Sequence, residues 1–217
     1  MNSKRFLIRS PQSQGDSKVR VNGISNLTLT AIEEFEKNIF TRWRLNNEKA
    51  AKDIVGEEYE NLRKRFYNQF GLSAAPAKIG DFNADLVVRD KKGKVCLIEE
   101  CKGHYVDSCF LDRFLMNVAR VLNFYLQESY EEKDIPYFFL SSMTKYSNFQ
   151  KKFDSIEKLF NEEIRNLITK KVKYFSFCDH DRVSRNKYFK NNKSGFDVSA
   201  LLIEEQENFI KEKMLVG

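Results

Sequence analysis

Residues 84–102 read Ala-Asp-Leu-Val-Val-Arg-Asp-Lys-Lys-Gly-Lys-Val-Cys-Leu-Ile-Glu-Glu-Cys-Lys, and this stretch decides the fold. Apolar residues dominate 84–88 and return at 95–98, which is the composition of two strands. The polar run between them contains a glycine and is typical of a tight turn. Leucine, valine and tyrosine then recur at helical spacing over about 109–127. The stretch therefore predicts a hairpin of two strands followed by a long helix.

On both sides of this hairpin, the hydrophobic pattern predicts further helices and strands. A hairpin that continues through a helix into another strand implies a mixed sheet with helices on both faces. The expected fold class is therefore α/β, with four or five strands flanked by helices. Apolar spacing places the other helices at about 27–44, 47–70, 149–167 and 199–214, and the other strands at 135–141 and 172–178.

Length and composition limit the class of protein. The chain has 217 residues, enough for one domain with a substantial core. Its 19 Phe and 9 Tyr exclude a largely disordered chain, and no apolar stretch approaches the ~18 residues that a membrane span requires. We expect one domain with a basic N-terminal arm at 1–26, a core at 27–178, and a basic loop with a C-terminal helix at 179–217.

The cysteines and the first residues bear on the compartment. Four cysteines in a chain of this size do not suggest a disulfide framework, so reduced thiols are expected. The basic residues near the N-terminus are not followed by the apolar segment of a secretory signal. We therefore expect a cytoplasmic protein without membrane contact.

Two acids and a lysine in the hairpin suggest a chemical function. Glu100 and Lys102 lie two residues apart on the returning strand and so share a face, and Asp85 comes close to them if the two strands pair. Two carboxylates can hold Mg²⁺ through oxygen, together with waters and phosphate. A bound metal polarises a phosphoryl oxygen, and a lysine can offset the charge that develops on the phosphate.

This arrangement resembles the PD-(D/E)xK nuclease superfamily, whose best-populated branch is the type II restriction endonucleases. Asp85 matches the first acid of the motif, and Ile98-Glu99-Glu100-Cys101-Lys102-Gly103 matches its second strand, although Ala84 stands where the family often has proline. The resemblance covers about 20 of the 217 residues. It implies a restriction-endonuclease-like core in which Asp85 and Glu100 hold Mg²⁺ and Lys102 positions the attacking water. The implied reaction is hydrolysis of a DNA phosphodiester that leaves a 5′-phosphate, catalysed by a homodimer.

Several assignments stay open at this point. Asp81 is a second candidate for the first acid, and Glu99 competes with Glu100, although only Glu100 has the two-residue offset from Lys102. Many members of the superfamily add an acid from an upstream helix. Glu58 and Glu36 interrupt apolar stripes in the two predicted upstream helices, where a carboxylate is costly unless it is paired or binds metal. Glu58 is the preferred third metal ligand because its helix leads directly into the hairpin.

The positive charge is concentrated near the end of the chain. The formal net charge is +6, and residues 182–193 contain five basic residues and no acid. Lys and Arg bind phosphates, and Arg and Asn can recognise base edges in the major groove. This segment is therefore predicted to contact double-stranded DNA. The proposed DNA-binding residues are Arg182, Arg185, Asn186, Lys187, Lys190 and Lys193.

The favoured function is sequence-specific cleavage of double-stranded DNA by a Mg²⁺-dependent type II restriction endonuclease. A structure-specific nuclease of the same superfamily, acting in repair, recombination or transposition, is the first alternative. It would cut branched DNA without sequence preference. A non-catalytic DNA-binding module is the second alternative, and it would bind DNA in Mg²⁺ without cutting it.

Overall fold

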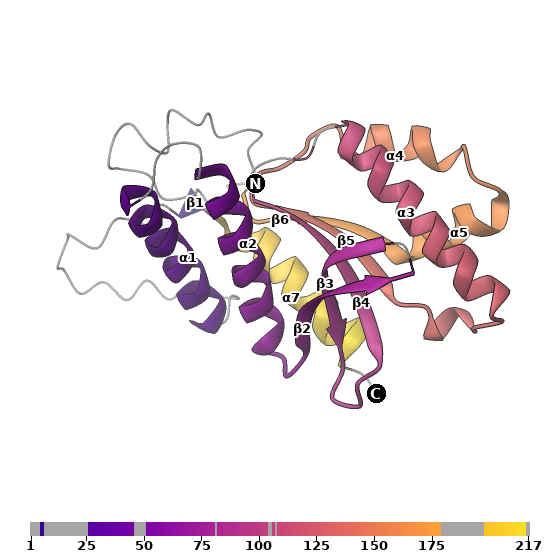
Figure 1. Ribbon diagram of the computed structural model, residues 1–217, viewed down its shortest axis with the longest axis horizontal. Coiled ribbons are helices and arrows are strands. Elements are labelled where there is room, and N and C mark those ends of the chain that lie inside the picture. Colours follow the sequence, from indigo (N-terminus) through magenta and orange to yellow (C-terminus); the bar gives the residue numbers. More distant parts are fainter. Residues whose placement is uncertain are drawn as a thin grey trace.

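A five-stranded mixed sheet lies at the centre of the computed structural model, between two groups of helices (Figure 1). The structure describes residues 5–6, 26–45, 51–80, 82–103, 106, 108–178 and 198–215. None of the helices in these ranges is both long and apolar enough to cross a membrane. The α/β class and the mixed sheet expected from the sequence are thereby confirmed.

The sheet has the strand order β2-β3-β4-β5-β6. Antiparallel pairing joins β2 to β3 and β3 to β4, whereas β4, β5 and β6 are parallel. The predicted hairpin is the β3–β4 pair, and the predicted helix after it returns the chain to β5. The strands are β2 (Ser73–Ile79), β3 (Phe82–Arg89), β4 (Val95–Lys102), β5 (Tyr137–Ser142) and β6 (Val172–Ser176).

Three helices pack on each side of the sheet (Figure 1). A two-stranded pair of β1 (Arg5–Phe6) with β7 (Val198–Ser199) lies apart from the main sheet, and a short 3₁₀ helix, η2 (Glu132–Asp134), precedes β5. One group of helices is α1 (Asn26–Leu45), α2 (Ala51–Asn68) and α7 (Ala200–Met214). The other group is α3 (Ser108–Gln127), α4 (Phe149–Glu157) and α5 (Glu162–Lys171).

The alternation of side chains along β4 divides the protein interior into two cores. Leu97 and Cys101 point into the core beneath α1, α2 and α7, whereas Ile98 points into the core beneath α3, α4 and α5. Successive side chains of a strand face opposite sides of the sheet, so β4 is covered on both faces. Its apolar sequence follows from this burial.

Two features differ from the expectation. The sequence of β2 was not recognised as a strand, because it has three alanines and Pro76 in place of β-branched residues, and proline is tolerated only at a sheet edge. The helix expected over 149–167 is two helices. The Asn161 side chain accepts a hydrogen bond from the Ile164 amide at 2.9 Å and so begins α5 as an N-cap.

A β-bulge interrupts β3 at the position of its acid, Asp85. Ala77 of β2 pairs with Ala84, and Ala75 pairs with Val87, so the step of two residues on β2 corresponds to three on β3. The extra residue lies at 85–86, opposite Pro76, which has no N–H for the ladder. A bulge shifts the alternation of side chains along its strand, and here it lets Ala84 and Val87, three residues apart, both face the core beneath α3, α4 and α5.

Candidate active site

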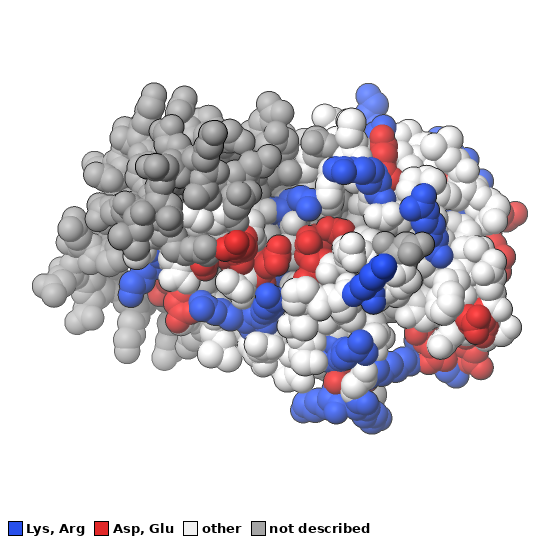
Figure 2. All heavy atoms as spheres, viewed as in Figure 1, with Lys and Arg blue, Asp and Glu red and all other residues white. Residues whose placement is uncertain are grey.

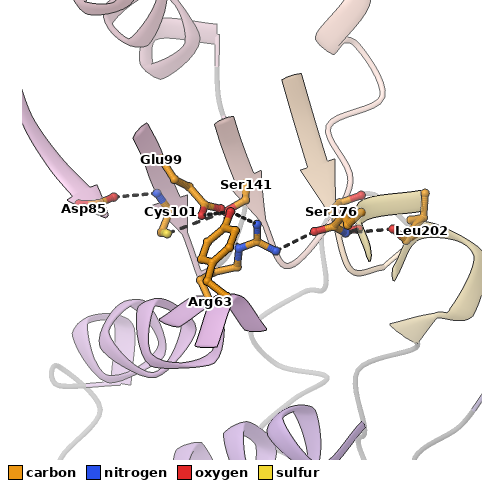
Figure 3. A network of polar contacts seen from close by, with 9 residues as sticks. Arg63, Asp85, Glu99, Cys101, Ser141, Ser176 and Leu202 are labelled. Atoms are coloured by element: carbon orange, nitrogen blue, oxygen red, sulfur yellow. Dashed lines mark hydrogen bonds and ion pairs between the residues drawn. The ribbon is translucent and has the colours of Figure 1, made fainter. Parts of the chain in front are cut away.

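Asp85 lies where β3 and β4 separate. The last paired residues of this ladder are Leu86 and Glu99, and beyond them the Asp85 carboxylate accepts a hydrogen bond from the Cys101 amide at 2.7 Å (Figure 3). A side chain thus takes the place of the next ladder hydrogen bond. The carboxylate is thereby fixed against β4 at the open end of the hairpin, and its remaining lone pairs stay available.

Glu100 and Lys102 complete a group of three charged side chains with Asp85. The Lys102 Nζ lies 3.7 Å from the Glu100 Oε2 and 3.9 Å from the Asp85 Oδ2. The Glu100 side chain is largely buried, with 12% of its surface exposed, while Lys102 keeps 30%. The sequence-based expectation that these three residues converge is met by this geometry.

The environment of Glu100 disfavours its charged form. Burial contributes most, and the neighbouring Asp85 charge and a hydrogen bond with Asp85 add to it, so the pKa of Glu100 rises to about 8. Lys102 opposes this shift without cancelling it. Two carboxyl groups this close together form a site that a cation would stabilise, because a cation offsets the repulsion between their charged forms.

The raised pKa of Glu100 makes stability depend on pH. Between its ordinary value of 4.5 and about 8, the folded protein holds a proton that the unfolded chain has lost. The contribution of Glu100 to the free energy of unfolding is therefore fully present below pH 4.5 and is lost as the pH rises through 8. Glu100→Gln is expected to remove this decline, which is on the order of a few kcal/mol. Urea unfolding in EDTA at pH 5 and pH 8.5 measures it, and identical pH dependence in the two proteins would contradict the shift.

Lys102 is also held by an aromatic ring. Its Nζ lies 4.0 Å from the centre of the Phe110 ring, in the first turn of α3. An ammonium over an aromatic face is attracted by the ring quadrupole. The helix that follows β4 therefore limits the positions that the ammonium group can adopt beside the two carboxylates.

A further acid, Glu60, faces the site from α2. Burial and then the charge of Asp85 raise the pKa of Glu60, and Lys102 partly offsets them. Gly103 explains how α2 comes so near, because a Cβ at this position would lie 2.7 Å from the carbonyl oxygen of Val55. Any larger residue directly after Lys102 would push α2 away from the end of β4.

The acid that the sequence favoured on this helix has a different environment. Glu58 is buried and accepts a hydrogen bond from the Asn38 side chain of α1 at 3.0 Å. Its position inside the apolar stripe of α2 directs it toward α1, whereas Glu60, at the edge of that stripe, faces Asp85. A signal for Glu60 was present in the sequence. Glu57 and Glu60 lie one turn apart, and like charges so close are unfavourable on an ordinary helix surface.

Glu99 is committed to the opposite face of the sheet. It is fully buried and binds the Arg63 Nε at 2.7 Å and the Tyr67 hydroxyl at 2.6 Å (Figure 3). Arg63 also donates to Gln206 of α7 at 2.7 Å. Burial is the largest single influence and lowers the pKa of Arg63, but Glu99 together with the neighbouring tyrosines and Cys101 outweighs it, so the net shift is upward. The choice of Glu100 over Glu99 agrees with this arrangement.

The thiol of Cys101, which lies between Glu100 and Lys102 on β4, has an environment that disfavours a nucleophilic role. Cys101 is buried, and burial followed by the Glu99 and Asp85 charges raises the pKa of its thiol well above the ordinary value. A thiol kept protonated is a poor nucleophile. All four cysteines are free thiols, as the sequence predicted.

The remaining candidates lie outside the described residues. These are Asp81, the side chain of Glu36, and the whole basic segment 182–193 with its proposed DNA contacts. The assignment of Arg182, Arg185, Asn186, Lys187, Lys190 and Lys193 to DNA binding stays a prediction.

The donor chemistry of the site fits Mg²⁺ better than a transition metal. Within the described ranges, no three Asp, Glu, His or Cys side chains are arranged as a complete metal cage. Mg²⁺ does not need one, since it commonly uses one or two carboxylates and keeps several waters. Asp85 and Glu100 supply hard oxygen donors of this kind, and Glu60 adds negative charge from α2.

The surface around the site carries charge of both signs. Figure 2 shows acidic side chains gathered near the middle of this face, with Lys and Arg side chains on both sides of them. An anionic polymer that crosses this face would meet cations on either side of the acidic centre.

Comparisons of the chain with protein-family models, with curated proteins and with solved structures give no match.

Proposed function

We propose that the protein is a Mg²⁺-dependent endonuclease that hydrolyses phosphodiester bonds of double-stranded DNA. The observation that carries the proposal is the convergence of Asp85, Glu100 and Lys102, with the ammonium within 4 Å of both carboxylates. The raised pKa of Glu100 supports it, because paired, desolvated carboxyl groups are a common property of catalytic and metal sites.

Each side chain has a distinct role in the proposed reaction. When bound to Asp85 and Glu100, Mg²⁺ would polarise a phosphoryl oxygen and make a water more acidic. Lys102 holds the attacking water and offsets the negative charge that develops on the phosphate oxygens. The water oxygen bonds to phosphorus as the bond from phosphorus to the 3′-oxygen breaks. A proton passes to that 3′-oxygen, and the products are a 5′-phosphate and a 3′-hydroxyl.

The proposed biological form is a type II restriction endonuclease with a restriction-endonuclease-like core. It would act as a homodimer in which each subunit cuts one strand. A two-fold symmetric enzyme suits a palindromic site.

Incubation with plasmid and phage DNA in Mg²⁺ tests the proposal. We expect discrete fragments with 5′-phosphate ends, and no cleavage once EDTA is added. Cleavage of branched DNA without discrete plasmid fragments would indicate the structure-specific alternative. Binding without cleavage in Mg²⁺ would indicate a DNA-binding module and would overturn the enzymatic proposal.

A further inference from the structure

One face of α3 carries a continuous row of cationic, amide and aromatic side chains. These lie at spacings of three, four, three and four residues, so they share one side of the helix. Arg113 and Arg120 are exposed, and Asn117 is half-buried between them. We call this row the α3 stripe, and it consists of Phe110, Arg113, Asn117, Arg120 and Phe124.

The α3 stripe begins at the candidate active site. The Lys102 Nζ lies 4.0 Å from the centre of the Phe110 ring, and the Arg113 Cζ lies 5.7 Å from the same centre. A substrate phosphate that reaches Lys102 is therefore one helical turn from Arg113. The stripe is continuous with the site at this end.

The other end of the stripe opens onto a cavity. This cavity of about 270 Å³ lies between α3 and the β2–β3 turn, and Asn117, Arg120 and Phe124 line it together with Ile79, Gly80 and Phe82. The Phe124 side chain keeps 53% of its surface exposed. An aromatic ring next to a cation is a combination that nucleic-acid surfaces use, with stacking for bases and charge for phosphates.

No ion pair neutralises the charge of the stripe in the part of the chain that the structure describes. Among the described residues, neither Arg113 nor Arg120 forms an ion pair. The only acid of α3, Asp112, pairs with Lys152 of α4 at 3.2 Å and lies off the stripe. Two exposed guanidinium groups beside an active site for phosphodiesters favour an anionic partner.

We propose that the α3 stripe binds the backbone of duplex DNA beside the phosphate to be cleaved. This inference rests on the proposed function and adds the surface that holds the substrate. From Phe110 to Phe124, the helix rises about 21 Å at 1.5 Å per residue. That length corresponds to about six base pairs at 3.4 Å each. Arg113 and Arg120 bind phosphates, and Phe124 contacts the sugar or base edge at the far end.

A pair of charge variants tests the stripe. Arg113→Ala/Arg120→Ala is compared with Lys211→Ala/Lys213→Ala, which removes the same charge from α7 on the opposite side of the sheet. Fluorescence anisotropy with a labelled duplex gives the dissociation constant across a salt series, with Asp85→Asn in every protein so that the duplex stays intact. We expect the stripe variant to bind at least about tenfold more weakly and its salt slope to fall by about two, while the α7 variant binds nearly as the parent.

Each outcome decides the inference. Equal losses in the two variants, or no loss in the stripe variant, overturn the stripe while leaving the proposed function standing. A parent protein that binds duplex DNA, loses that binding with the stripe, and never cleaves in Mg²⁺ supports the stripe and overturns the proposed function. A parent that binds no duplex overturns both.

Steady-state cleavage by proteins with Asp85 intact gives a second, independent readout. The stripe variant is expected to raise KM by at least about tenfold while kcat changes by less than about threefold, because the lost contacts position the substrate and do not touch the reacting atoms. Phe124→Ser, which removes the apolar ring that contacts the sugar or base edge, is expected to weaken binding by about fivefold or more. A fall in kcat without a change in KM would contradict a binding role.

Discussion

Lys102→Ala is expected to lower the rate of DNA cleavage by about 10²- to 10³-fold while the folded structure is retained. The reason is that the Lys102 ammonium lies within 4 Å of both Asp85 and Glu100, where charge develops in the proposed reaction. Loss of a charge that stabilises the transition state typically costs this much in kcat. Single-turnover cleavage of an end-labelled duplex at saturating enzyme measures the effect, because it separates the chemical step from binding.

A conservative variant, Lys102→Arg, and the affinity of both variants for duplex DNA provide two further checks of this prediction. Lys102→Arg keeps the charge but replaces a compact ammonium by a planar guanidinium, so only partial recovery of the rate is expected. Duplex affinity should change by less than about tenfold in both variants, since one contact among several is altered. A Lys102→Ala protein that cleaves at the wild-type rate would show that the lysine has no part in the chemistry.

Arg63→Met is expected to reduce the free energy of unfolding by about 3–5 kcal/mol. Arg63 and Glu99 are both fully buried, and removal of the guanidinium leaves the Glu99 carboxylate inside the protein with its charge unpaired and with the hydrogen bond from the Tyr67 hydroxyl. The substitution should also disturb the candidate active site, because Glu99 adjoins Glu100 on β4. Urea denaturation monitored by circular dichroism measures the change.

Two comparisons separate this effect from a general sensitivity of α2. Arg65→Met, two residues along the same helix, breaks an exposed pair with Glu34 and should cost less than about 1 kcal/mol. The double variant Arg63→Met/Glu99→Leu should recover much of the loss, because a buried ion pair can often be replaced by apolar side chains. Equal destabilisation by Arg63→Met and Arg65→Met would contradict the importance of the buried network.

The hairpin could be predicted from sequence because its signals are local. The β3–β4 pair has an apolar run, a turn with Asp90 and Gly93, and a second apolar run, and the helix after it has a clear period. The strand β2 could not be predicted in this way. Its alanines and Pro76 carry little intrinsic preference for a strand, and its pairing with β3 supplies the stability instead.

The acids of the site show where sequence reasoning ends. The offset of two residues places Glu100 and Lys102 on one face, and this expectation needs only the geometry of a strand. The position of Glu58 inside an apolar stripe marked it as unusual, but the sequence does not say which neighbour pairs with it. The Asn38 side chain, 20 residues earlier, forms a hydrogen bond with Glu58, whereas Glu60 faces Asp85. Only the packing of α1 on α2 and of α2 on the sheet distinguishes the two acids.

The same limit applies to the bulge and to the α3 stripe. Asp85 lies at a bulge where β3 carries an extra residue opposite Pro76, a consequence of strand pairing that the sequence of β3 alone does not reveal. Likewise, the spacing of Arg113 and Arg120 is visible in the sequence, but their continuity with Lys102 depends on Phe110 meeting the end of β4. Contacts between distant segments therefore join the proposed substrate surface to the proposed catalytic residues.

The central claim is that Asp85 and Glu100 form a Mg²⁺-dependent site for DNA hydrolysis. Its most direct test is single-turnover cleavage of duplex DNA across a Mg²⁺ titration by the wild-type protein and by Asp85→Asn, which changes one carboxylate to an amide of the same shape. We predict cleavage by the wild-type protein that depends on Mg²⁺ and a rate at least about 10³-fold lower for Asp85→Asn at every Mg²⁺ concentration. Equal rates for the two proteins, or cleavage that persists in EDTA, would contradict it.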